Sequence, residues 1–170
     1  MSSTATLPDT AATGVNDAES GSESGAALHW RALERLYTHA PINRLFESNI
    51  EITGEGVARI HFRVDESVYH AAGAAHGTIY FKMLDDAAFY AANTMVTDRF
   101  LLTTSFNMHF IRPVRSGMIT AEGRWTSGRR RVLVAESRLI DHDGEEIARG
   151  TGTFMRSRIP LSGLAGYKSE

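Results

Sequence analysis

The stretch from His76 to Asn93, HGTIYFKMLDDAAFYAAN, decides the fold of this chain. It starts with a small His-Gly-Thr turn and continues as roughly four helical turns that are apolar on nearly every side. A helix with that pattern must be buried on every side. Two adjacent aspartates, Asp85 and Asp86, nevertheless lie in its middle, and carboxylates are rarely buried without a partner. We therefore expect a buried helix over residues 78–95 whose aspartates face a cavity or an interface.

Segments with other periodicities flank this helix. Apolar residues at helical spacing predict an amphipathic helix over residues 28–39, which Ala40-Pro41 ends. Elsewhere apolar and polar residues alternate, which is typical of half-buried strands joined by turns such as Asp143-Gly144. The predicted strands are residues 50–52 and 57–64 before the long helix, and 101–111, 118–125, 131–140 and 147–155 after it.

One apolar helix and one sheet predict an α+β fold. The sheet must bury the helix, so we expect a curved antiparallel sheet wrapped around one long central helix. Residues 27–157 should form this single domain. Residues 1–26 should be a disordered N-terminal tail because they offer little apolar surface, and residues 158–170 should be a flexible C-terminal tail. A second copy of the chain should cover the sheet edges and the helix's remaining exposed side.

Composition excludes several classes of protein. The chain contains no cysteine, so a disulfide framework, a thiol nucleophile and a cysteine–metal site are impossible. Residues 1–26 carry four acidic side chains and no Lys or Arg, which leaves a formal charge of +2 on residues 27–170. That near-neutral domain argues against nucleic-acid binding, and the apolar runs are too short to span a membrane. No metal-ligand spacing appears, so we predict no metal and no cofactor, and the lack of a targeting signal predicts a cytoplasmic location.

Residues 45–156 resemble the hotdog-fold acyl-CoA thioesterases, in particular the branch that acts on phenylacetyl-CoA and hydroxybenzoyl-CoA. The resemblance rests on the His76-Gly77-Thr78 turn, on Asp85 in the helix that follows, and on Phe110-Ile111-Arg112-Pro113 at the end of a strand. Two positions depart from the family pattern. Thr78 replaces a second glycine, and His70 replaces an asparagine that the branch often carries six residues before the histidine.

The resemblance implies hydrolysis of aryl or fatty acyl-CoA thioesters to the free acid and CoA. Asp85 would be the general base or the nucleophile, and the Gly77 N–H, at the positive end of the helix, would stabilise the oxyanion. Asp85 lies on the order of 10 Å along the helix from its start, so one helix cannot easily place both groups on one carbonyl. The family's arrangement implies a homodimer or a homotetramer in which the turn of one subunit faces the aspartate of another.

Each candidate residue also has a purely structural interpretation. Asp85 could instead form a salt bridge with Lys82, but we assign Lys82 to Asp86, four residues after it, and expect Asp86 to be structural. Thr103 stands eighteen residues after Asp85, where some relatives place a catalytic serine. His70, His76 and Thr78 are candidate substrate contacts, Arg112, Arg129 and Arg130 could bind the CoA phosphates, and Phe81, Phe89, Tyr90 and Met108 could line an acyl tunnel.

A structural role is the alternative to each of these functional roles. His76 would be a hydrogen-bonding turn residue, the arginines a solvated hairpin tip, the apolar set ordinary core, and Asn93 a helix-end cap. Two other functions remain open at this point. One is a hotdog hydratase or dehydratase acting on enoyl thioesters, which would need a His–acid pair such as His76 and Asp85. The other is an acyl-CoA-binding module without catalysis.

Overall fold

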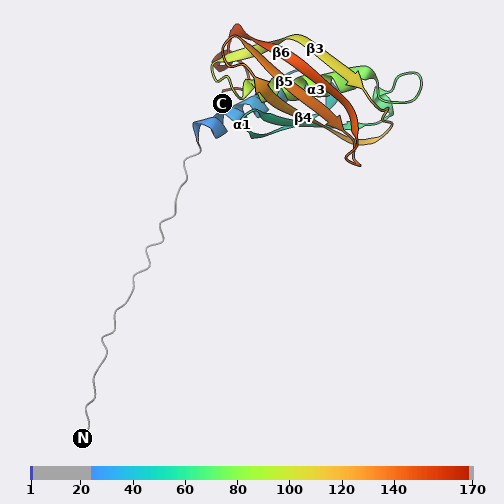
Figure 1. Ribbon diagram of the computed structural model, residues 1–170, viewed down its shortest axis with the longest axis horizontal. Coiled ribbons are helices and arrows are strands. Elements are labelled where there is room, and N and C mark those ends of the chain that lie inside the picture. The colour runs from blue at the N-terminus through green and yellow to red at the C-terminus, as the bar shows by residue number, and fades with distance from the viewer. Residues whose placement is uncertain (2–23, 169–170) are drawn as a thin grey trace.

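The computed structural model describes residue 1 and residues 24–168 (Figure 1). Two helices open the described chain, a hairpin follows, and a long helix precedes four strands, in the order predicted from the sequence. The long helix begins one residue earlier and ends two residues earlier than expected. The elements are α1 (Gly25–His39), α2 (Asn43–Phe46), β1 (Asn49–Gly54), β2 (Val57–Val64), α3 (Gly77–Asn93), β3 (Arg99–Phe110), β4 (Gly117–Ser127), β5 (Val132–Ile140) and β6 (Glu146–Pro160), with 3-10 turns at Glu66–Val68 and Leu161–Gly163.

The six strands form one antiparallel sheet in the order β1-β2-β4-β5-β6-β3. Tight turns make β4 and β5, and β5 and β6, neighbours, as expected. β3 is different, because it does not pair with β4 but lies beyond β6 at the sheet edge. α3 packs against β2, β3, β4, β5 and β6, which confirms an α+β fold with the sheet wrapped around one long helix (Figure 1).

Small residues let the sheet approach α3 closely. Ala87, Ala88 and Ala91 are fully buried on the helix. Gly123 of β4 lies against the Ala87 backbone, where an added Cβ would stand only 2.0 Å from the Ala87 carbonyl oxygen. Ser137 of β5 donates a hydrogen bond of 2.8 Å to the Leu84 carbonyl oxygen. Any larger residue at position 123 would therefore push the helix off the sheet.

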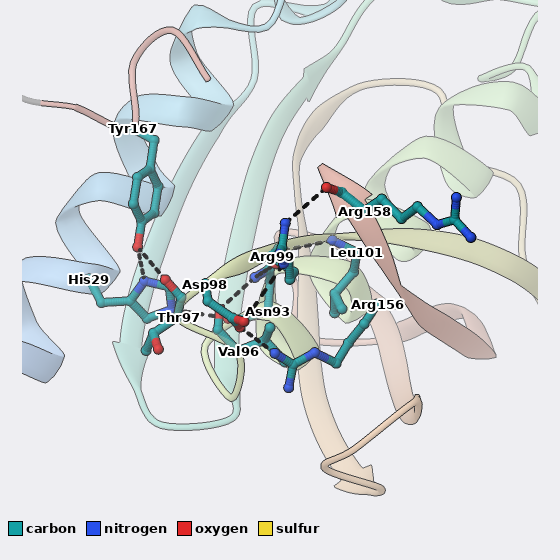
Figure 2. Close-up of polar contacts among 10 residues, drawn as sticks. All are labelled: His29, Asn93, Val96, Thr97, Asp98, Arg99, Leu101, Arg156, Arg158 and Tyr167. Atoms are coloured by element: carbon teal, nitrogen blue, oxygen red, sulfur yellow. Dashed lines mark hydrogen bonds and ion pairs between the residues drawn. The ribbon is translucent and has the colours of Figure 1, made fainter. Parts of the chain in front are cut away.

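The chain after residue 157 is part of the fold, which corrects the expected C-terminal tail. β6 runs to Pro160 and Leu161 is fully buried. The Tyr167 hydroxyl lies 2.7 Å from His29 Nδ1 of α1 and 3.3 Å from the Thr97 carbonyl oxygen (Figure 2). Individual residues such as Leu161 and Tyr167 anchor this segment. Because individual anchors form no periodic pattern, the sequence did not reveal them. A flexible tail from residue 158 is therefore wrong for residues 158–168.

The other chain end differs less from expectation. The predicted disordered tail at 1–26 lies mostly outside the described residues. Gly25 and Ala26 belong to α1, whose first turn is capped by Ser24 through a 3.2 Å hydrogen bond from the Ala27 N–H. No helix among residues 24–168 is long and apolar enough to cross a membrane.

The far end of α3 is tied to α1 and to the C-terminal segment, as Figure 2 shows. His29 Nε2 lies 3.0 Å from the Asn93 carbonyl oxygen, and a carbonyl can only accept, so Nε2 carries the proton. The buried Asn93 amide donates to the carbonyls of Val96 and Arg99 and accepts from the Leu101 N–H. We call His29, Asn93, Thr97 and Tyr167 the terminal clasp.

Candidate active site

The start of α3 presents an unused backbone donor. His76 caps the helix through Nδ1, which accepts from the Thr78 N–H at 3.2 Å and lies 3.0 Å from the Thr78 hydroxyl. The Gly77 N–H has no hydrogen-bond partner among residues 24–168. The Phe110 ring packs over Gly77 so closely that an added Cβ would lie 3.1 Å from it. Gly77 therefore offers a free N–H at the positive end of a 17-residue helix.

Asp85 lies on the half-open side of α3 and contacts Thr103 of β3. The Thr103 hydroxyl donates to the two carboxylate oxygens at 3.1 and 3.3 Å. Thr103 pairs with the fully buried Phe154, so it lies on the face of the sheet turned toward α3. Burial raises the pKa of Asp85 to about 6, while the Thr103 hydrogen bond opposes the rise. The structure thus brings two predicted site residues into contact, and their roles stay predictions.

Asp86 is held by Lys82, as predicted. The Lys82 ammonium contacts the Asp86 carboxylate and lies 2.7 Å from Asn43 Oδ1 of α2. It also stands 5.3 Å from the ring centres of Tyr37 and Phe46. The alternative in which Lys82 forms an ion pair with Asp85 is not what the structure shows. The contributions of Asn43, Tyr37 and Phe46 left no signal in the sequence, because none of them belongs to a motif.

Aromatic side chains border the carboxylate. Phe81, one turn before Asp85, is 44% exposed and meets the half-buried Phe106 of β3 edge to face at 5.7 Å. The Phe106 ring lies on Gly150 and Gly152 of β6, where an added Cβ would collide with it. We call Gly77, Phe81 and Asp85 the open strip of α3. Of the other proposed acyl contacts, Met108 is partly buried, whereas Phe89 and Tyr90 are buried and belong to the core.

The arginines do not gather in one protomer. Arg112 forms an exposed ion pair of 2.6 Å with Glu145, and its carbonyl accepts from the Tyr80 hydroxyl near the start of α3. Arg129 stacks on Trp125 at 5.0 Å and is 3.9 Å from Glu55. Trp125 and Arg129 belong to the hairpin of β4 and β5, and Trp125 packs on Gly56. The Gly56 N–H donates to the Thr94 hydroxyl, just beyond the far end of α3. The two ends of α3 are roughly 24 Å apart at 1.5 Å per residue.

The remaining sequence candidates have local roles. His70 is exposed in a turn where its Nδ1 accepts from the Ala72 N–H at 3.1 Å, away from any contact with Asp85. Asn93 binds the backbone beyond the helix end, which agrees with the cap interpretation. No group of His, Asp and Glu side chains suited to a metal ion occurs in the described part of the chain. His76 and Asp85 do not form a His–acid pair within residues 24–168.

A second hollow, which the sequence did not indicate, lies on the sheet face turned away from α3. It measures about 660 Å³ and is lined by residues from five strands, β2 to β6. Arg59 and Arg138 both bind Glu122 across it, and Arg149 binds Glu146. These pairs neutralise one another, and Asp85 and Thr103 do not line the hollow. It is therefore separate from the candidate active site.

Comparisons with known proteins agree with this geometry. Residues 72–148 match the family described as "Thioesterase superfamily". This segment is similar to a thioesterase superfamily domain. A protein of Saccharolobus solfataricus named "Putative esterase" is 27% identical over 101 residues, which is 59% of this chain and 67% of that protein.

Solved structures show that the fold is the hotdog fold. The PaaI protein of the Escherichia coli phenylacetic acid degradation operon superposes with a TM-score of 0.73 at 18% identity, over 81% of this chain and 99% of that one. A thioesterase of Haemophilus influenzae gives a TM-score of 0.66 at 18% identity, over 72% and 86%. The family match and these relatives support thioester hydrolysis as the general activity.

Proposed function

We propose that this thioesterase superfamily protein hydrolyses acyl-CoA thioesters, with aryl or fatty acyl groups, to the free acid and CoA. The observation that carries the proposal is the Asp85–Thr103 pair. A half-buried carboxylate whose pKa is raised to about 6 is largely ionised at neutral pH yet still basic enough to take a proton. The hydroxyl orients it without neutralising it.

In the proposed reaction Asp85 acts on water or on the thioester itself. As a general base it removes a proton while the water oxygen attacks the carbonyl carbon; as a nucleophile it attacks that carbon directly, and water then releases the acid. In both cases the carbonyl oxygen gains negative charge, which the free N–H of Gly77 stabilises. The carbon–sulfur bond then breaks, and the CoA thiolate takes up a proton.

Two subunits supply these groups in the proposal. Gly77 and Asp85 are separated by about two turns, or roughly 12 Å, along one helix, so a single carbonyl cannot reach both. β3 is an edge strand that exposes Leu102 and Phe110, and such an edge is normally covered. We therefore propose a homodimer, alone or within a tetramer, in which Gly77 of one subunit faces Asp85 of the other.

The two groups of arginines suit this arrangement. Arg112 lies near the start of α3, whereas Arg129 and Arg130 lie near its other end. An antiparallel meeting of two helices would bring the groups from different subunits to one site, where they would bind the CoA phosphates. His76 and Thr78 flank the carbonyl in this proposal, while His70 contributes at the exposed turn beyond them.

The first experiment is hydrolysis of a panel of short-chain, long-chain and aryl acyl-CoA thioesters by wild type and Asp85→Asn. We expect Asp85→Asn to lower kcat/KM by about 100-fold or more, since a general base contributes that much. Asp143→Asn, on an exposed turn, is the matched control and should keep the wild-type rate. A rate for Asp85→Asn close to wild type would refute the mechanism.

The second experiment tests the backbone donor. Gly77→Pro removes the N–H at the first helical position, where proline is well tolerated, and the extended His76 before it suits a proline. Gly77→Ala is the control, because it adds a Cβ against Phe110 but keeps the N–H. We expect a much lower kcat for the proline variant than for the alanine variant.

Subunit mixing then tests the dimer. Neither Asp85→Asn nor Gly77→Pro should hydrolyse thioesters well alone. A mixed dimer would contain one intact site, so equal mixing and reassembly should restore about a quarter of the wild-type rate. No recovery would place both groups in the same subunit.

A further inference from the structure

Lys82 stands at helical distance from both aspartates. It is three residues before Asp85 and four before Asp86, and a lysine can pair with a carboxylate at either spacing. If the ammonium bound Asp85, the carboxylate would be neutralised and blocked. In the structure it binds Asp86 instead.

The helices α1 and α2 explain this choice. The Lys82 side chain is only 10% exposed, and its ammonium is enclosed by Asn43 Oδ1 at 2.7 Å and by the rings of Tyr37 and Phe46, each at 5.3 Å. Asn43 is itself fixed, because its Nδ2 donates to the Tyr37 carbonyl at 2.6 Å. An oxygen and two ring faces make a site for a cation. We call Tyr37, Asn43 and Phe46 the lysine cage.

The cage lies on the other side of α3 from β3. Asp86 turns toward α1 and α2, whereas Asp85 turns toward Thr103, as neighbouring residues on a helix point about 100° apart. The cage therefore draws the ammonium toward Asp86. Asp85 keeps a hydrogen bond from an uncharged hydroxyl as its side-chain contact within residues 24–168.

We propose that Lys82, Asp86 and the lysine cage form a positioning device that keeps the ammonium off Asp85 and sets the proton affinity of that carboxylate. This inference rests on the proposed role of Asp85 in hydrolysis. Lys82 and Asp86 are positioning residues, since they act through Asp85. The device extends the active site to α1 and α2, which lie outside the segment that matches the family.

The electrostatic surroundings of Asp85 give the sign of each effect. After burial and the Thr103 bond, the negative charge of Asp86 raises the pKa of Asp85 and the positive charge of Lys82 lowers it. Both charges lie on α3, and β3 contributes only the neutral Thr103. Tyr37 of α1 stays neutral because burial raises its pKa. The two charges therefore act on the pKa of Asp85 in opposite directions, with that of Asp86 the larger.

The test is a direct titration of the Asp85 carboxyl by carbon-13 NMR, assigned with Asp85→Asn. Asp86→Asn leaves the ammonium uncompensated, so the Asp85 midpoint should fall by about one pH unit. Lys82→Met removes the cation, so the midpoint should rise by a similar amount. The acid limb of kcat/KM should move in the same two directions. Glu146→Gln, which breaks an exposed pair on the outer sheet face, should change neither.

Asn43→Ala tests the cage while both charges remain. It should let Lys82 approach Asp85, lower the midpoint and reduce kcat severalfold with little change in KM. Thermal melting checks that each variant is folded. If Lys82→Met does not fold, Asp86→Asn carries the test, because it keeps the shape of the side chain. Equal midpoints in wild type and Asp86→Asn would overturn the inference. The titration needs no turnover, so it tests this inference separately from the proposed function. The proposed function fails if Asp85→Asn keeps its activity.

Discussion

The open strip lies on α3, the terminal clasp is built around the last residue of that helix, Asn93, and the two treat polar groups in opposite ways. In the clasp, the Asn93 amide makes three hydrogen bonds and both His29 nitrogens have partners. In the open strip, the Gly77 N–H has no partner within the described residues 24–168, and the Asp85 carboxylate accepts from one neutral donor. Fully paired buried groups fix a structure, whereas unpaired capacity is available to a ligand. Within the 17 residues of α3, this contrast distinguishes residues that hold the fold from residues proposed to act on substrate.

The largest effect should come from breaking the clasp with Asn93→Ala. The substitution leaves the Val96 and Arg99 carbonyls and the Leu101 N–H without their partner, so we expect a loss of about 3 kcal/mol in the free energy of unfolding. Chemical denaturation measures it. Thr97→Ala, which removes an exposed side chain but keeps the carbonyl that Tyr167 contacts, is the control. A loss below about 1 kcal/mol would contradict the structural role of Asn93.

The opposite result is expected in the open strip. Burial raises the pKa of Asp85 from 3.8 to about 6, so the ionised carboxylate costs stability once the pH passes through that interval. Asp85→Asn should therefore increase the free energy of unfolding at pH 7 by about 1 kcal/mol, after allowance for partial exposure. At pH 3 the gain should vanish. Thermal melting at both pH values measures it, and a destabilised variant at pH 7 would contradict this account.

The smallest effect concerns pH and the clasp. Burial lowers the pKa of His29 below 6.5, against the opposing hydrogen bond to the Asn93 carbonyl. Below pH 6.5 the His29 side chain binds a proton more readily in the unfolded chain than in the folded chain. Stability therefore falls as the pH drops below 6.5, whereas above it the neutral imidazole carries no such cost. His29→Gln should reduce the loss of stability between pH 7.5 and 5.5. If the free energy of unfolding of His29→Gln changes with pH as steeply as that of wild type, the pH dependence belongs to another group.

Sequence reasoning located the open strip well. The His-Gly-Thr turn, Asp85 and Thr103 came from a family motif, and the structure brings Asp85 and Thr103 into contact. The Lys82–Asp86 pair came from helical spacing together with the family motif, which reserved Asp85 for the site. Periodicity also gave the bounds of α3 to within two residues.

The clasp and the lysine cage were missed for a physical reason. His29, Tyr167 and Asn43 act through single long-range contacts, which no local pattern encodes. The position of β3 was missed for the same reason, because its paired residues follow it by 38 to 61 positions and two other strands come between them in the chain. Pairings that join distant segments need the folded geometry.

The strand order also determines when the candidate active site can form during synthesis. Among the strands of residues 24–168, β3 pairs with β6 alone, so it has no strand partner until residues 146–160 have left the ribosome. A shorter nascent chain can already fold α3 against β2, β4 and β5. In that chain β3 is not yet held in the sheet, so the proposed catalytic pair of Asp85 and Thr103 is completed when β6 joins it.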